Sequence, residues 1–207
     1  MIATVYIAAV DATLGEEEWR PFVAAQGFGH LVAAGRDRAT PVVVPTQFAL
    51  DGDDVVLHLA APNPLLVAVA EHPGVVLSVA GDWAYIPSDW KAIGDDDPLL
   101  GIPTTYYGAV QLVGRAAVVS EPAEVAAILR SQLADVQPDT PIADPLVAHA
   151  AKLRSIRGVR IAVDDVRAKF KYGGNVDPAH RAAVAERLRA RGRPGDQAAA
   201  GHALRRG

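Results

Sequence analysis

Short apolar runs, each closed by turn residues, constrain the fold of this chain more than any other feature. The runs with the length and β-branched content of strands are 29–35, 40–50, 55–60, 75–81, 106–119 and 158–172. A DGDD turn at 51–54 separates two of them and predicts a hairpin. Helix patterns are fewer, at 14–26, 63–72, 121–133, 145–155 and 178–191. This balance predicts a mainly β protein, a small β-barrel with peripheral helices, rather than a parallel sheet between two helical layers.

Several classes of protein are excluded by what the 207 residues lack. There is no Cys, which removes disulfides, thiolate metal sites and a cysteine nucleophile. The chain has neither of the glycine-rich phosphate loops, and no HExxH or GxSxG motif. No apolar run is long enough for a transmembrane helix, and the start of the chain lacks the basic and small residues of a secretion signal. We therefore expect a cytoplasmic protein without a membrane segment.

The charge is divided unevenly along the chain. Residues 1–151 carry a net charge of −13 and residues 152–207 a net charge of +9. The basic part could bind an anionic partner, or it could pair with the acidic part of the same chain or of a second subunit. Nucleic-acid binding stays possible on charge alone, but no helix-turn-helix motif supports it.

The first candidate site is HLAAPNP at 58–64. His58 stands near the end of a predicted strand, and Asn63 and Pro64 are suited to begin a helix. A helix N-terminus offers free N–H groups to an anionic ligand. A lone histidine on a strand also commonly satisfies a structural hydrogen bond, so both roles stay open for His58.

The second candidate is an aromatic segment, WAYIPSDW at 83–90 followed by IPTTYY at 102–107. Tyr and Trp beside proline-stiffened turns suit a flat conjugated ligand. They equally suit a loop that is anchored to the barrel by its aromatic side chains.

The third candidate is the segment KFKYGGN at 169–175. Lys169 and Lys171 are two apart on a predicted strand and so share a face, and the two glycines allow close backbone approach or a left-handed turn. Lys171 could bind a phosphate or a propionate, or it could be a solvated lysine that protects an edge strand.

The order of these motifs resembles that of the PaiB-type family of FMN-binding split-barrel proteins, over roughly residues 14–190. His58, Ala60, Asn63 and Pro64 are similar to the family's His-x-Ala-Arg-x-Asn-Pro pattern. The later matches are Tyr85, Ile86 and Trp90, then Ile102, Pro103, Thr104 and Tyr107, then Lys169, Lys171 and Asn175. The resemblance implies a split β-barrel of the FMN-binding type, a homodimer, and a cofactor bound near the subunit interface by His58, Asn63, Tyr85, Trp90, Thr104, Tyr107 and Lys171.

Departures from the family pattern bear on the cofactor. The family Arg is Ala61 here, its Trp-Asn is Thr105-Tyr106, and its Ser-Gln is Gly173-Gly174. The chain therefore lacks several of the groups that a flavin would use. It keeps His58, and a neutral imidazole is a strong axial ligand for haem iron. This combination resembles the haem-dependent piperazate synthases of the family, which close an N–N bond in an N-hydroxylated ornithine-type amino acid.

Three hypotheses follow from the sequence. The first is an enzyme that acts on a small-molecule substrate and carries haem b with His58 as axial ligand; no catalytic residue is assigned. The second is an FMN-binding protein that works as a flavin-dependent enzyme or a transcriptional regulator, and the third is a cofactor-free dimer. For all three we expect residues 1–192 to form a single split-barrel domain with a C-terminal helix, and residues 193–207 to form a disordered tail.

Overall fold

A computed structural model describes residues 5–92 and 97–206 of the chain. Its strands are β1 (Phe28–Ala33), β2 (Val42–Gln47), β3 (Ala49–Asp51), β4 (Asp54–Ala60), β5 (Gly74–Ile86), β6 (Thr104–Val119) and β7 (Ile156–Lys171). Its α-helices are α1 (Glu16–Gln26), α2 (Pro64–Glu71), α3 (Pro122–Val136), α4 (Pro145–Ala148), α5 (Ala150–Leu153), α6 (Pro178–Arg191) and α7 (Asp196–Arg205). Three 3₁₀ turns are η1 (Ala9–Asp11), η2 (Ser88–Trp90) and η3 (Pro98–Leu100).

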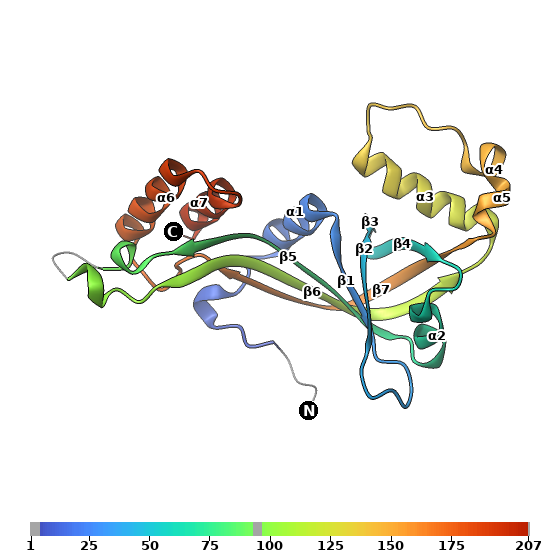
Figure 1. Cartoon of the computed structure of the whole chain (residues 1–207), viewed down its shortest axis with the longest axis horizontal. Coiled ribbons are helices and arrows are strands. Elements are labelled where there is room, and N and C mark those ends of the chain that lie inside the picture. Colours follow the sequence, from blue (N-terminus) through green and yellow to red (C-terminus); the bar gives the residue numbers. More distant parts are fainter. Residues whose placement is uncertain (1–4, 93–96, 207) are drawn as a thin grey trace. The chain divides into compact units, whose positions relative to one another are not determined.

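The strands form one seven-stranded sheet in the order β2-β1-β5-β6-β7-β4-β3, with helices at its periphery (Figure 1). The pairs β1–β2, β1–β5, β3–β4 and β4–β7 are antiparallel. The DGDD turn closes the β3–β4 hairpin, where Asp51 pairs with Asp54. This mainly β, split-barrel fold with peripheral helices confirms the fold class that the strand pattern predicts.

The contacts within the chain divide it into two compact units. Unit 1 comprises residues 1–22, 80–110 and 168–207, and unit 2 comprises residues 23–79 and 111–167. The long strands β5, β6 and β7 contribute residues to both units. Sequence reasoning does not reveal these units, because each is assembled from segments far apart in the chain.

Unit 1 has an aromatic core on the side of the sheet that its helices cover. Phe22 meets Phe170 edge-on at 5.2 Å between ring centroids, and Tyr106 meets Tyr172 in the same way at 6.0 Å. The ring of Tyr172 is stacked on the imidazole of His202 at 4.5 Å. Aromatic pairs in these geometries stabilise a core beyond their area burial.

The expectation that residues 193–207 form a disordered tail is wrong, because helix α7 occupies most of that segment. Ala199, Ala200 and Ala203 are fully buried, and α7 packs beside α6 (Figure 1). Arg206 donates to the carboxylate of Glu18 at 2.6 Å, and both side chains are nearly inaccessible to solvent. Alanine gives little hydrophobic signal in a sequence, yet its small size lets a helix approach its neighbour closely.

Unit 2 has an aliphatic core. Its large, fully buried side chains include Leu31, Leu57, Leu65, Leu77, Leu112 and Ile161. Helix α3 lies against β4, so the outer face of β4 is covered by a helix (Figure 1).

Arg160 on β7 binds Asp51 at 2.8 Å and Asp54 at 3.0 Å. These ion pairs, and that of Arg206 with Glu18, join the basic part of the chain to its acidic part.

Candidate functional site

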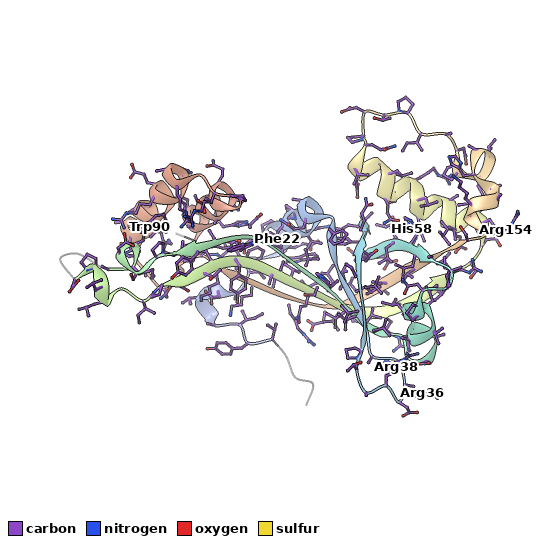
Figure 2. The ribbon with its side chains drawn as sticks, in the orientation of Figure 1. Phe22, Arg36, Arg38, His58, Trp90 and Arg154 are labelled. Atoms are coloured by element: carbon purple, nitrogen blue, oxygen red, sulfur yellow. The ribbon has the colours of Figure 1, made fainter. Side chains whose placement is uncertain are left out.

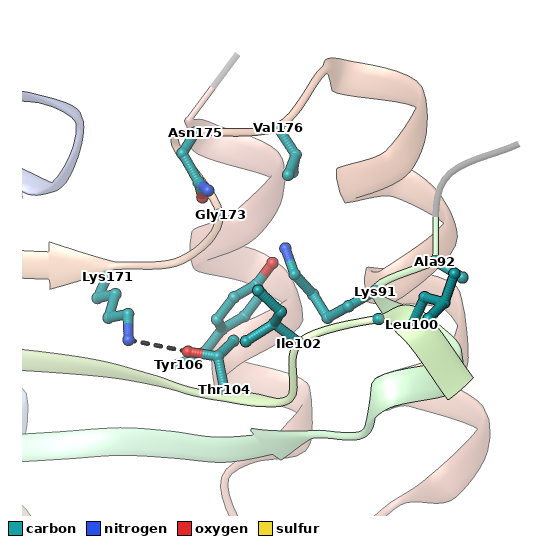
Figure 3. A pocket seen from close by; sticks show the side chains of 11 residues that line it. Lys91, Ala92, Leu100, Ile102, Thr104, Tyr106, Lys171, Gly173, Asn175 and Val176 are labelled. Atoms are coloured by element: carbon teal, nitrogen blue, oxygen red, sulfur yellow. Dashed lines mark hydrogen bonds between the residues drawn. The ribbon is translucent and has the colours of Figure 1, made fainter. Parts of the chain in front are cut away.

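The strongest candidate site is a cavity of about 490 Å³ in unit 1, within the size range of small-molecule sites (Figure 3). It lies where β6 begins and β7 ends, beside the chain that follows η2 and η3. Its polar lining residues are Lys91, Thr104, Tyr106, Lys171 and Asn175. Its apolar lining comes from Ala92, Leu100, Ile102 and Val176, with Gly101 and Gly173.

Two lysine side chains dominate the charge of this cavity. The Lys171 ammonium donates to the hydroxyl of Thr104 at 2.8 Å (Figure 3). Burial lowers the pKa of Lys91, and the positive charge of Lys171 lowers it further. Among the described residues, neither lysine has a carboxylate partner within ion-pair distance. An anionic group in this cavity would therefore gain attraction from two cations that nothing in the described chain neutralises.

Tyr106 adds a buried hydroxyl to the same cavity. The residue is 1% exposed, and its hydroxyl oxygen has no hydrogen-bond partner in the described part of the chain. Burial raises the pKa of this phenol, so the group stays protonated and able to donate. A buried polar group without a partner is costly, and such groups call for a ligand or a water molecule. The hydroxyl is thus a donor that a ligand could satisfy.

The turn after β7 brings the backbone against this hydroxyl. Gly173 has a φ of +80°, and a side chain there would collide with the Tyr106 hydroxyl. Only glycine combines that backbone conformation with that closeness. The close approach that we predicted for the GGN segment is therefore present, and it forms one wall of the cavity.

The predicted site residues of the aromatic segment are distributed differently. Thr104 and Lys171 line the cavity, whereas Tyr85, Trp90 and Tyr107 are absent from its lining. Tyr85 is 48% exposed on β5, and Trp90 lies under the guanidinium of Arg191 at 4.8 Å. Tyr107 is half-buried beside the ammonium of Lys169, which lies 5.8 Å from its ring centre.

The remaining predicted residues, His58 and Asn63, belong to unit 2 and are absent from the lining of the unit 1 cavity. His58 is half-buried on β4 (Figure 2), and its Nδ1 lies 2.7 Å from the Oε1 of Gln132 on α3. Gln132 is 2% exposed and donates to the carbonyl of Gln47 at 3.0 Å. The Asn63 side chain accepts from the backbone N–H of Leu65 at 3.0 Å, which confirms it as the N-cap of α2.

Sequence reasoning missed Lys91, Tyr106 and Gln132. For Gln132 a signal was available, because it continues the buried stripe of Val125 and Ile128 along α3. For Tyr106 the signal was the two-residue period of β6, which gives Tyr106 and Tyr107 opposite faces. Nothing in the sequence around Lys91 distinguishes it from a solvated lysine.

Comparisons with known proteins place this split-barrel chain in a family. The family described as "Putative FMN-binding domain" matches residues 5–165, and the chain belongs to this PaiB-type FMN-binding family. The chain is 26% identical over 182 residues to the protease synthase and sporulation protein PAI 2 of Bacillus subtilis, an alignment that covers 85% of this chain and 84% of that protein.

Solved structures share the fold at lower sequence identity. The FAD and heme binding protein of Mycobacterium smegmatis aligns with a TM-score of 0.62 and 16% identity, over 79% of this chain and 74% of that one. The flavocytochrome Anf3 of Azotobacter vinelandii aligns with a TM-score of 0.60 and 20% identity, over 78% of this chain and 70% of that one.

None of the helices among the described residues has the length and apolar character of a membrane span.

Proposed function

We propose that this protein binds FMN and that the unit 1 cavity holds the phosphate of the cofactor. The observation that carries the proposal is the pair of lysines, Lys91 and Lys171, which share the cavity without a carboxylate partner in the described chain. A phosphate monoester carries nearly two negative charges, which two ammonium groups balance. Membership of the FMN-binding family supports the same ligand.

The residues of the cavity fit the group. The hydroxyls of Thr104 and Tyr106 are donors for phosphate oxygens, and the Tyr106 hydroxyl has no described partner. The apolar residues Leu100 and Ile102 offer contact area for an uncharged part of the ligand. FMN supplies redox chemistry when bound, while the side chains of the protein bind it, orient it and exclude water.

The test compares FMN with riboflavin, which lacks the phosphate, by fluorescence titration of the full chain. We expect FMN to bind more tightly than riboflavin. The Lys171→Met variant should lower the affinity for FMN by roughly tenfold or more, because a hydrogen bond to a charged group contributes about 1.5–3 kcal/mol. Riboflavin should bind this variant as it binds the unchanged chain.

Lys169→Met is the matched control, because Lys169 lies two residues away on the same strand but contacts Tyr6 and Tyr107 instead of the cavity. It should leave the preference for FMN intact. Equal affinities for FMN and riboflavin in the unchanged chain would refute the phosphate site, and so would a loss in Lys169→Met as large as that in Lys171→Met.

A second candidate function is the haem-dependent enzyme of the sequence analysis, which resembles piperazate synthase and forms an intramolecular N–N bond. The observation that favours it is the contact between Nδ1 of His58 and Oε1 of Gln132 at 2.7 Å. Histidines that bind metals usually donate their other ring N–H to a neighbouring group, and here this arrangement would leave Nε2 as the ligand atom.

The absorption spectrum of the purified protein distinguishes the two candidates. A Soret band supports haem, and a flavin band near 450 nm supports FMN. With haem, His58→Ala should abolish or shift the Soret band, whereas Lys171→Met should leave the band position unchanged. If His58→Ala binds haem with an unaltered spectrum, His58 is not the ligand.

We also propose that the protein is a homodimer, as the family resemblance implies. Trp83 is 63% exposed and Tyr85 48% exposed on the same face of β5. Exposed aromatic side chains of this size are enriched at protein interfaces. The division of the sequence into acidic and basic parts would give two chains complementary surfaces.

A further inference from the structure

A second cavity, of about 370 Å³, lies in unit 2 between α3, the chain that leads to α4, helix α5 and the start of β7. All of its lining residues belong to unit 2, and none of them lines the unit 1 cavity. A ligand in this cavity would therefore occupy a site separate from that of FMN, and its binding would not depend on FMN.

The cavity exists because the chain between α3 and β7 forms only short helices. Helices α4 and α5 have four residues each, and they are separated at His149, whose φ of −132° is not helical. This broken segment does not cover the apolar side of α3 completely. Leu129 and Leu133, one helical turn apart on α3, line the cavity and stay half-buried.

The floor of the cavity is packed and its mouth is open. Leu129 and Ile156 pack against the buried cluster of Val125, Ala126 and Leu153, which forms a firm apolar base. Toward the mouth, Ile142 is 39% exposed although it lines the cavity. The site is therefore preformed, mostly apolar and accessible from solvent, as is typical of sites for small molecules.

The polar residues of the lining are cationic or neutral. Lys152, His149 and Ser155 are exposed and line the cavity. In the described chain the Lys152 ammonium has no carboxylate partner. Asp144, on the neighbouring loop, is engaged with Arg130 at 3.5 Å and accepts from the backbone N–H of Leu146. An apolar interior beside an unopposed ammonium matches a ligand with an apolar body and one negative charge.

We propose that this cavity binds a medium-chain aliphatic monocarboxylate, with its alkyl chain among Leu129, Leu133 and Ile142 and its carboxylate beside Lys152. The alkyl chain gains the free energy of removal from water. The carboxylate stays at the exposed mouth, where it pairs with the ammonium without the large cost of burying a charge.

The test is calorimetric titration of the full chain with octanoate, 1-octanol and octylamine, which share a chain length and differ in head-group charge. Octanoate should bind more tightly than octanol, and octylamine should bind most weakly. The Lys152→Met variant keeps an apolar stem but lacks the charge. Its affinity for octanoate should be about fivefold lower, since an exposed ion pair contributes up to about 1 kcal/mol to binding. Octanol should bind this variant as before.

Two further variants complete the design. Arg154→Met removes a positive charge from an exposed neighbour that is absent from the lining, and it should leave octanoate affinity unchanged. Ala143→Trp places a large side chain in the cavity from an exposed loop position, and it should abolish binding of octanoate and octanol alike. Undetectable octanoate binding, equal affinities for octanoate and octylamine, or an Ala143→Trp variant that binds normally would each overturn the proposal.

Discussion

Replacing Tyr106 with phenylalanine should stabilise the ligand-free protein and weaken its binding of FMN. Removal of one hydroxyl group should cause both effects. The Tyr106 hydroxyl is buried without a hydrogen-bond partner among the described residues, and such a group costs about 1–3 kcal/mol. Its removal should raise the free energy of unfolding by about 1 kcal/mol, which for a chain of this length raises Tm by roughly 2–4 °C. Differential scanning calorimetry of the ligand-free protein measures this change.

The same variant should bind FMN less tightly. If the hydroxyl donates to a phosphate oxygen, the variant loses a charge-assisted hydrogen bond worth about 1.5–3 kcal/mol, which is roughly tenfold or more in affinity. Because burial raises the pKa of Tyr106, the hydroxyl stays protonated and the loss should not depend on pH near neutrality. Titrations of FMN at two pH values check both statements.

Two other tyrosines provide controls: Tyr107, the next residue on β6, and Tyr172, which directly follows β7. The hydroxyl of Tyr172 donates to the carbonyl of Asp82 at 3.1 Å, so Tyr172→Phe should lower the free energy of unfolding by about 1 kcal/mol. Tyr107 does not line the cavity, so Tyr107→Phe should leave FMN affinity unchanged. A Tyr106→Phe variant that is less stable than the unchanged chain, or that binds FMN equally well, would refute the reasoning.

Three further predictions concern pH, backbone and assembly. Burial lowers the pKa of His202 from its ordinary 6.5, so the unfolded chain binds a proton on this residue more tightly than the folded chain does. The free energy of unfolding should therefore be highest above pH 6.5 and should fall as the pH drops below 6.5. In urea unfolding, His202→Gln should make the free energy of unfolding depend less on pH. Gly173→Ala should cost more than about 1 kcal/mol and abolish FMN binding, because a Cβ would meet the Tyr106 hydroxyl, whereas Gly192→Ala, also at positive φ but without that collision, should spare FMN binding. Sedimentation should show a dimer that dissociates more readily as the salt concentration rises. The Trp83→Glu variant should sediment as a 21.7 kDa monomer. An unchanged chain that is monomeric at micromolar concentration would contradict the proposed dimer.

The fold was predictable because its signals are local. Val55, Leu57 and Leu59, which alternate in the sequence, are buried on β4, and Val56 on the other face is buried as well; the DGDD turn closes the predicted hairpin. The Asn63-Pro64 pair predicts the start of α2, since a side-chain cap and a fixed φ act within a few residues. Helix α7 was missed because its stability comes from contacts with distant segments, such as that of Arg206 with Glu18, rather than from its own alanine-rich sequence.

The sequence by itself determined the mainly β class, the family and the presence of a lysine, a threonine and a glycine pair suited to an anion. Only the tertiary structure decided that Lys171 meets Thr104, that Lys91 joins them, and that Tyr106 presents its hydroxyl to the same cavity. It also decided that Gln132 holds the ring of His58. The physical reason is that strand and turn preferences depend on neighbouring residues, whereas an uncompensated charge or an unpaired hydroxyl depends on which distant side chains the fold brings near.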